Sequence, residues 1–404
     1  MPGTELFGEE EKKEIMDVLE TGILFRYNHD EQRKGIWKAR TFEKELAAYH
    51  GVGFAHLTTS GTTADNLALA ACGIGVGDEV IVPTFTFIAP VEAVLQAGAI
   101  PVFADIDETL CLSVASIRAA MTTKTKAVVV VHMCGAMAQI DEITGFCKKN
   151  DLILIEDTAQ ALGASYKGKM LGTFGKVAVY SFDFFKIVSA AEGGAIITDD
   201  KELYDIASQH ADHGHTHIGS NRGAEPHHLI GTNFRISELH AAIGLAQFRK
   251  LPYILSRQRA NKIKLEEFLS KFPQVSFRHI PDKDGDSATF LDFFLENEEM
   301  TRKILKEFDK QSVGYAYWYD NNYHYFKNWE HIKHLKSAAR LGISMFTPPQ
   351  DYATLQIPVS DKIMSRLVSL QIRITWTESE IKLLTERIER AFNDAFRKTV
   401  SGPK

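Results

Sequence analysis

Residues 58–64, TTSGTTA, combine small and hydroxyl side chains just before a good helical stretch. At the N-terminus of a helix, free backbone N–H groups and the helix dipole attract an anion such as a phosphate group. The segment therefore predicts an anion site at this turn. A plain N-cap by Ser60 is the ordinary alternative, because serine and threonine are common capping residues.

An acidic residue follows a second segment, the apolar run 152–156. Ligands of α/β sheets bind beyond the carboxyl ends of the strands, which is where Asp157 would lie. A carboxylate there stays ionised beside a cationic partner and holds that charge in place. A helix cap or a solvated strand end is the ordinary alternative for Asp157.

A lysine follows a third apolar run, because Lys186 lies five residues after Ser181. The neighbours of Lys186 in the sequence are apolar: Phe182, Phe184, Phe185, Ile187 and Val188. Burial among them would lower the pKa of the lysine and favour the neutral amine, which is the form that makes a Schiff base. A lysine that extends its ammonium into water is the ordinary alternative.

Three further patterns are weaker indications of a functional site. Asn233 and Arg235 precede a predicted helix with small residues, where a loop with an ordinary cap explains them equally well. Residues 163–170 resemble a P-loop, but Met170 replaces the serine or threonine that binds magnesium, which argues against a phosphotransferase. Six histidines between residues 210 and 228 lie in a polar stretch, and we expect a loop at the rim of a site and no metal.

In combination, the first three segments supply what pyridoxal phosphate needs: a helix N-terminus for the phosphate, a carboxylate for the ring nitrogen and a lysine for the aldehyde. At these residues the chain resembles the DegT/DnrJ/EryC1/StrS sugar aminotransferases, over about residues 40–250 and more weakly toward both ends. The resemblance rests on stretches such as TSGTTADNLALAACGIGVGDEVIVPTFTFIAP, LIEDTAQALGASYKGKMLGTFGKVAVYSFDFFK and GTNFRISELHAAIGLAQFRKL.

The resemblance implies a fold-type I aminotransferase with Lys186 and Asp157 as catalytic residues. Lys186 would hold the cofactor as a Schiff base, Phe87 would stack on its ring, and Gln160 would lie near the ring oxygen. Asn233 would reach the phosphate of the neighbouring subunit in a homodimer with shared sites. The full set implied to bind pyridoxal 5'-phosphate is Ser60, Gly61, Thr62, Phe87, Asp157, Gln160, Ser181, Lys186 and Asn233.

The resemblance also implies L-glutamate as amino donor and a keto or aldehyde sugar as acceptor. Pro90 and the run 183–185 differ from the residues usual in the family, and the segment 21–35 is similar to the branch that aminates 3,8-dideoxy-8-oxo-manno-octulosonate for lipopolysaccharide. A nucleotide-linked keto sugar is the alternative acceptor. A non-catalytic sensor with the same fold is an alternative of another class, whereas Lys186 argues against a sugar dehydratase, in which a histidine replaces the lysine.

Three segments are candidates for contact with the acceptor: 23–34, 210–228 and the aromatic run 315–325. The first of them, an arm without a clear period, carries basic and aromatic side chains that could hold a carboxylate or phosphate at the mouth of the site. A solvated charged loop is the ordinary alternative. The substrate residues expected from these segments are Arg26, Tyr27 and His215.

The elements that must position these residues follow an α/β pattern. Nearly continuous apolar runs predict buried strands of a mostly parallel sheet at 79–83, 101–105, 127–132, 152–156, 177–182 and 195–198. Helical stretches fit between several of them, at 62–73, 88–97, 113–121 and 140–149. Further helices are predicted at 8–21, within 233–268 and at 377–396. We expect residues 1–250 to form an N-terminal arm and a large cofactor-binding domain, and 251–404 a smaller α+β domain.

Composition excludes several classes of protein. The chain has 404 residues, 45% of them hydrophobic, with a net charge of −6, which is unlike a disordered protein or one that binds nucleic acid non-specifically. Four scattered cysteines predict reduced core thiols. The sequence has no apolar run of about 20 residues and no apolar segment near its start, so we expect a soluble cytoplasmic protein without a signal peptide.

Overall fold

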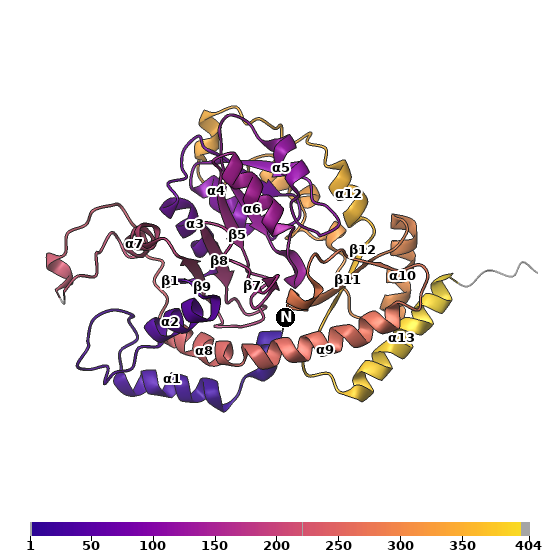
Figure 1. The fold of residues 1–404 in the computed structure, drawn as a ribbon, viewed down its shortest axis with the longest axis horizontal. Coiled ribbons are helices and arrows are strands. Elements are labelled where there is room, and N and C mark those ends of the chain that lie inside the picture. The colour runs from indigo at the N-terminus through magenta and orange to yellow at the C-terminus, as the bar shows by residue number, and fades with distance from the viewer. Residues whose placement is uncertain (1, 220, 397–404) are drawn as a thin grey trace, which may run out of the picture.

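A seven-stranded sheet forms the centre of the molecule in the computed structural model, which describes residues 2–219 and 221–396 (Figure 1). The strand order is β1-β9-β8-β5-β4-β2-β3. All neighbours pair in parallel except β9, which is antiparallel to both β1 and β8. The strands are β1 (Phe54–Thr58), β2 (Glu79–Pro83), β3 (Ile100–Ala104), β4 (Thr125–Val131), β5 (Ile153–Asp157), β8 (Val177–Ser181) and β9 (Gly194–Thr198).

Helices cover both faces of this sheet, because nearly every strand residue is buried and apolar. One face packs against α3 (Gly61–Ala71), α4 (Ala89–Gln96) and α7 (Lys201–His210). The other face packs against α2 (Lys38–His50), α5 (Val114–Ala120), α6 (Ile140–Lys149) and α8 (Glu238–Arg249). Helix α1 (Glu9–Thr21) lies along α8 (Figure 1) and ends at Gly22, whose left-handed φ of +68° suits a helix C-cap.

A second, antiparallel sheet lies at the end of the molecule away from β1 and α7 (Figure 1). Its strands are β10 (Ser276–Phe277), β11 (Phe290–Phe294) and β12 (Leu367–Gln371). One hydrophobic cluster joins these strands to α9 (Leu251–Leu269), α10 (Glu298–Lys310) and α13 (Glu378–Phe396). Helix α9 begins next to the predicted domain boundary at residue 250, which itself stays a prediction.

The segment 318–364 returns to the first sheet. It contains α11 (Glu330–Lys333), α12 (Pro358–Met364) and several 3-10 turns. The aromatic rings of Phe326 and Trp329 are buried in the same cluster as Phe103 of β3. The backbone of this segment is also bound to the loop after β2, because Thr86 N–H donates to the carbonyl of His324 at 3.0 Å. Part of the C-terminal half is therefore held against the loop that follows β2.

The predicted fold class is confirmed, and every predicted strand and helix is present with ends shifted by a few residues at most. Strand β1 and helices α2 and α7 were not predicted. The P-loop-like segment forms a hairpin of β6 (Ser165–Tyr166) and β7 (Lys169–Met170) and opens no helix. The cysteines are free thiols, and Cys72 is the one that is partly exposed among them.

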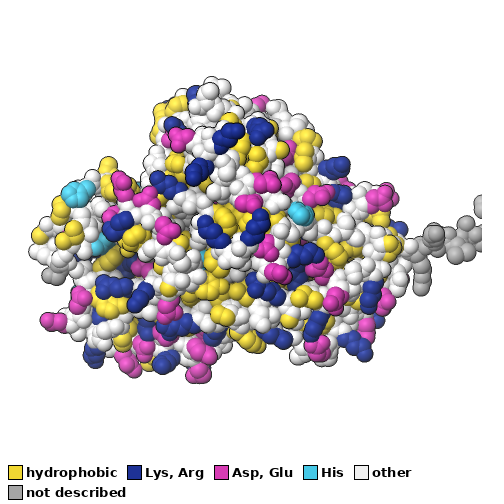
Figure 2. Space-filling view, in the orientation of Figure 1, with side chains coloured by type: hydrophobic (Ala, Val, Ile, Leu, Met, Phe, Trp, Pro, Cys, Tyr) yellow, Lys and Arg dark blue, Asp and Glu magenta, His cyan; other side chains and the backbone are white. Residues whose placement is uncertain are grey.

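Figure 2 shows acidic and basic side chains interspersed over the face of the molecule that it presents. Within residues 2–219 and 221–396, no helix is long and apolar enough to cross a bilayer.

Arg278 supports the junction of the two sheets and gives a stability prediction. Its buried guanidinium donates to the carbonyls of Thr109 and Met133 and pairs with Asp292 of β11 at 3.1 Å. Arg278→Met should lower the free energy of unfolding by about 3–5 kcal/mol, because Asp292 would be left as an uncompensated buried charge. Urea unfolding followed by circular dichroism measures this change.

The matched control is Arg302→Met, which removes a more exposed arginine paired with Asp320 at 2.8 Å. Arg302→Met should lower the free energy of unfolding by about 1 kcal/mol at most. Equal destabilisation by the two substitutions would show that the Arg278 contacts do not hold the junction.

Candidate active site

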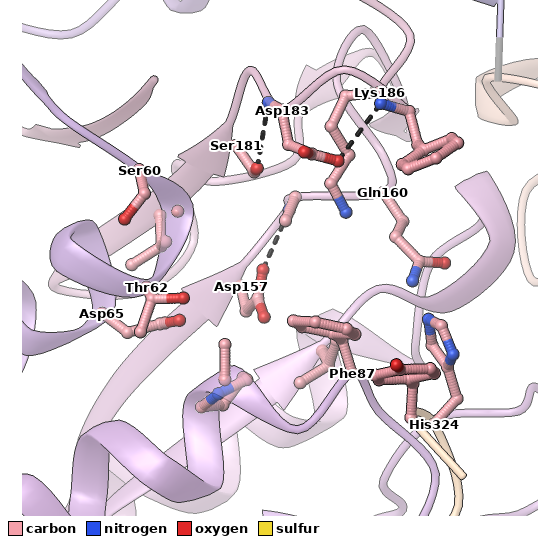
Figure 3. A pocket seen from close by; sticks show the side chains of 18 of the residues that line it. Ser60, Thr62, Asp65, Phe87, Asp157, Gln160, Ser181, Asp183, Lys186 and His324 are labelled. Atoms are coloured by element: carbon pink, nitrogen blue, oxygen red, sulfur yellow. Dashed lines mark hydrogen bonds between the residues drawn. The ribbon is translucent and has the colours of Figure 1, made fainter. Parts of the chain in front are cut away.

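A cavity of about 640 Å³ opens at the carboxyl ends of β5 and β8 (Figure 3). Asp157 is the last residue of β5 and Ser181 is the last residue of β8, as expected for a ligand site in an α/β sheet. Eight of the nine residues expected to bind the cofactor line this cavity: Ser60, Gly61, Thr62, Phe87, Asp157, Gln160, Ser181 and Lys186.

The turn at the start of α3 has a side-chain cap and also two backbone N–H groups without a hydrogen-bond partner among the described residues. The hydroxyl of Ser60 accepts the N–H of Thr63 at 3.1 Å, so the N-cap alternative is correct. Within the described chain, no hydrogen bond uses the N–H groups of Gly61 and Thr62. A Cβ at position 61 would lie 2.7 Å from the Cβ of Ser181, so only glycine fits there. The helix N-terminus and the Ser181 hydroxyl thus form a cradle that suits a phosphate group.

Two buried carboxylates lie below this cradle (Figure 3). Asp157 accepts the N–H of Ala159 at 2.9 Å, and burial raises its pKa against the opposing effects of that bond and of Lys186. Asp65, the fifth residue of α3, has its pKa raised well above the usual range by burial and by the charge of Asp157. A positive charge bound beside Asp157 would therefore be strongly stabilised.

Lys186 lies on the opposite side of the cavity, with Nζ 6.0 Å from the centre of the Phe87 ring. Burial lowers the pKa of this lysine, while the carboxylates of Asp157 and Asp183 partly oppose the shift. Of the apolar neighbours named in the sequence analysis, Phe182, Ile187 and Val188 are buried, whereas Phe184 and Phe185 are 52% and 67% exposed. Lys186 itself is half-buried and lines the cavity.

Aromatic residues from the C-terminal half close the cavity, and Figure 3 shows Phe87 and His324 beside each other. Their ring centres are 5.3 Å apart, and Trp318 and Tyr323 also line the wall. Asn321 Oδ1 lies 3.0 Å from Nδ1 of His324, and burial, aided by Lys186, lowers the pKa of His324 to about 3. The aromatic content of 315–325 was the only sequence signal for these residues.

The arm does not reach this cavity, contrary to the expectation for Arg26. The Arg26 guanidinium is buried, where it pairs with Glu43 at 2.6 Å and donates to the carbonyl of Leu57 at 2.8 Å. Tyr27 stacks on His217 with ring centres 4.1 Å apart. The three expected substrate residues Arg26, Tyr27 and His215 are all absent from the lining of this cavity.

The arm packs instead on the histidine-containing segment. The buried carboxylate of Asp212 binds His217, Arg222 and Arg235 at 2.6–2.9 Å, which satisfies both of its oxygens. Nδ1 of His215 lies 3.3 Å from the carboxylate of Glu225. No group of three or more His, Cys, Asp or Glu side chains is placed to hold a metal in the part of the chain described.

Asn233 is exposed and does not line the cavity. Its side chain accepts the N–H of Arg235 at 3.3 Å, and its backbone pairs with Asp212. The neighbouring Arg235 forms a β-bridge with Thr58 at the end of β1, so this segment runs close to the turn at the start of α3. The expected contact of Asn233 with a second subunit stays a prediction.

Comparison with known proteins places the chain in a family. The model of the DegT/DnrJ/EryC1/StrS aminotransferase family matches residues 7–389. The chain belongs to this family. The family predicted from the sequence is therefore confirmed.

Individual relatives agree with this membership. The chain is 42% identical to a GDP-perosamine synthase of Escherichia coli O157:H7, over 54% of this chain and 59% of that protein. It is 39% identical to an L-glutamine:2-deoxy-scyllo-inosose aminotransferase of Micromonospora echinospora, over 59% of each. The chain thus matches less than two thirds of the length of these relatives. An aminotransferase structure from Psychrobacter cryohalolentis superposes with a TM-score of 0.82 at 27% identity, covering 96% of this chain and 98% of that one.

The burial of Lys186 gives a prediction about its reactivity. In the ligand-free protein, Lys186 should react with an amine-selective reagent at a lower pH than exposed lysines, because only the neutral amine is nucleophilic. Asp157→Asn should lower the pH midpoint further, since the Asp157 carboxylate raises the pKa of Lys186. Mass spectrometry of the Lys186 peptide across a pH series measures this.

Asp183→Asn is the matched control, because its carboxylate has the same sign of effect but a smaller one. It should move the midpoint less than Asp157→Asn does. A midpoint for Lys186 at or above that of exposed lysines would contradict the burial of its amine.

Proposed function

We propose that the chain is a pyridoxal-phosphate-dependent aminotransferase that moves an amino group to a sugar ketone or aldehyde. The observation that carries this proposal is the presence, in one cavity, of the Lys186 amine, the buried Asp157 carboxylate and the open N-terminus of α3. Family membership supports the same class of reaction.

The residues of the cavity fit each part of the cofactor. The N–H groups of Gly61 and Thr62 and the hydroxyl of Ser181 suit its phosphate, and the close approach of Gly61 to Ser181 shapes that cradle. The Phe87 ring is placed to stack on the flat ring of the cofactor. Asp157 suits the ring nitrogen and Lys186 suits the aldehyde.

The bound cofactor supplies an aldehyde that takes up the amino group and a ring that withdraws electrons. Asp157 keeps a proton on the ring nitrogen, because a buried carboxylate strongly favours a cation beside it. Nζ of Lys186 would take up and return the proton of the substrate carbon that bears the amino group, once in each half-reaction, and its lowered pKa favours the neutral amine that this role needs. Phe87 and His324 give this side of the cavity an aromatic surface.

A nucleotide-linked keto sugar is the acceptor that we propose, with L-glutamate or L-glutamine as donor. One relative is named for a GDP-linked amino sugar and another for L-glutamine and an inosose. Support for an octulosonate acceptor is weaker, because the arm that suggested it does not reach the cavity. The expected link to lipopolysaccharide and the expected cytoplasmic location stay predictions.

The glutamate half-reaction tests this function and separates it from a non-catalytic sensor. Holoenzyme mixed with L-glutamate or L-glutamine should release one equivalent of the 2-oxo acid, and turnover should continue only with an acceptor. The acceptors to compare are GDP-4-keto-6-deoxymannose, 2-deoxy-scyllo-inosose and the octulosonate aldehyde. A cofactor-binding chain that releases no 2-oxo acid from either donor would be a sensor.

Asp157→Asn should slow the half-reaction at least about 100-fold, because the ring would lose the charge that keeps its nitrogen protonated. Stopped-flow absorbance of the holoenzyme measures this rate. Asp141→Asn is the matched control, since that carboxylate pairs with Lys167 outside the cavity and its loss should leave the rate unchanged. A rate for Asp157→Asn close to that of the unchanged protein would refute the role of Asp157.

A homodimer with shared sites is part of this proposal. Of the described residues that line the cavity, Lys186 is the only lysine or arginine, while Asp65, Asp157, Asp183 and Glu192 are all acidic. A phosphate and the carboxylates of the donor need further positive groups and donors. The exposed Asn233 beside the anion-binding turn suits contact with a second copy of the chain.

Mixing inactive variants tests the shared site. Lys186→Ala and Asn233→Ala chains should regain activity when their subunits exchange, because each hybrid dimer has one site free of both changes. Mixing Lys186→Ala with Asp157→Asn is the control and should give no recovery, since both changes then lie in the chain's own sites. Verified exchange without recovery in the first mixture would show that Asn233 acts within its own chain.

A further inference from the structure

We propose that the N-terminal turn, the 3-10 helix Pro2–Leu6, positions Lys186 and links its backbone to the second sheet. This inference rests on the proposed function, because Lys186 carries that function, and it adds Gly3 and Glu5 as positioning residues. Neither of them lines the cavity, so each acts through the backbone groups that it binds.

Gly3 holds the backbone of Lys186. The N–H of Gly3 donates to the carbonyl of Lys186 at 3.1 Å, and among the described residues this carbonyl accepts no other hydrogen bond. Lys186 lies between β8 and β9, in a loop that belongs to no sheet. Its own N–H donates to the nearby carbonyl of Asp183 at 2.9 Å, which is a local contact. Gly3 therefore supplies the contact that fixes the Lys186 backbone from a distant part of the chain.

The space at position 3 admits only a glycine. A Cβ there would lie 2.6 Å from the carbonyl oxygen of Lys186 and 2.9 Å from the backbone nitrogen of Ser189. Both are backbone atoms and Ser189 is fully buried, so neither can move aside without a change in the loop. A side chain at position 3 would therefore displace the backbone of Lys186.

Glu5 holds the chain where it leaves the second sheet. One oxygen of its carboxylate accepts the N–H groups of Ile374 and Thr375 at 3.0 and 3.2 Å and the hydroxyl of Thr375 at 3.0 Å. Hydrogen bonds to a carboxylate are stronger than those between neutral groups. Gln371, the last residue of β12, lies three residues before Ile374 and lines the cavity. The N-terminal turn therefore binds two segments next to the cavity, one that follows β8 and one that follows β12.

The N-terminal turn is itself anchored to the large helices. The carbonyl of Leu6 accepts Nζ of Lys250 at 2.7 Å, at the junction of α8 and α9. Lys250 also pairs with the buried carboxylate of Glu11 on α1 at 2.6 Å. Gly3 and Glu5 are two residues apart within this anchored turn, so a shift of the second sheet would reach the Lys186 backbone through it.

The reactivity of Lys186 in the ligand-free protein tests this role without any turnover. Gly3→Ala should slow the reaction of Lys186 with an amine-selective reagent near neutral pH at least about threefold, because a displaced backbone takes the amine out of the surroundings that lower its pKa. Glu5→Ala should act in the same direction. Glu5→Gln should restore most of the rate, since an amide oxygen can still accept the same hydrogen bonds. Mass spectrometry of the Lys186 peptide measures each rate.

Gly8→Ala is the matched control for Gly3→Ala. A Cβ at position 8 would meet the side-chain carboxylate of Glu10 at 3.4 Å, which is an ordinary contact. The rate for Lys186 in this variant should equal that of the unchanged protein. Circular dichroism checks that every variant is folded, and the two Glu5 variants carry the test if Gly3→Ala does not fold.

The holoenzyme gives a second measurement. Gly3→Ala and Glu5→Ala should lower kcat at least about tenfold with little change in the KM of the donor, because a misplaced amine slows proton transfer and does not weaken binding. Unchanged Lys186 reactivity and unchanged kcat in the folded variants would overturn the positioning role, and so would an equal loss in Gly8→Ala. If the unchanged holoenzyme released no 2-oxo acid while the variants still slowed the labelling of Lys186, the proposed function would fail and the positioning of Lys186 would stand.

Discussion

The parallel pairing of β5 with β8 is the constraint on which the site depends. Neighbouring parallel strands end at the same edge of a sheet, so Asp157 and Ser181 open onto one cavity. The chain needs only five more residues to bring Lys186 to the same space. Gly61 then packs against Ser181 too closely for any side chain, which seats the N-terminus of α3 beside the strand ends. The Lys186 amine, the Asp157 carboxylate and the N-terminus of α3 thus line one cavity.

Residues of the C-terminal half form part of the wall of the cavity at the strand ends. Backbone hydrogen bonds join Thr86 to His324 and Phe326 to Thr84, so the segment around His324 is held against the loop that carries Phe87. The same segment continues from Trp318, which lines the cavity that holds Lys186. Phe290 of β11 and Gln371 of β12 line the same cavity as Asp157 and Ser181, so both sheets contribute to its walls.

Elements that are set by neighbouring residues in the chain could be predicted from the sequence. The continuous apolar run at 79–83 matches β2 to the residue, whereas β1 (Phe54–Thr58) was missed because the buried His56 interrupts its apolar pattern. His324 reaches the cavity through pairing between distant segments, which no local pattern reveals. Arg26 was misplaced for a similar reason, because a charge pattern does not show which arginine finds a buried glutamate.

Reduction of the holoenzyme with borohydride tests most directly whether Lys186 is the amine that holds the cofactor. The reduced protein is digested, and mass spectrometry locates the residue that carries the added cofactor mass. We expect this mass on the peptide that contains Lys186, and we expect it to disappear in Lys186→Ala. Cofactor mass on a different lysine of the unchanged protein would contradict the site described here.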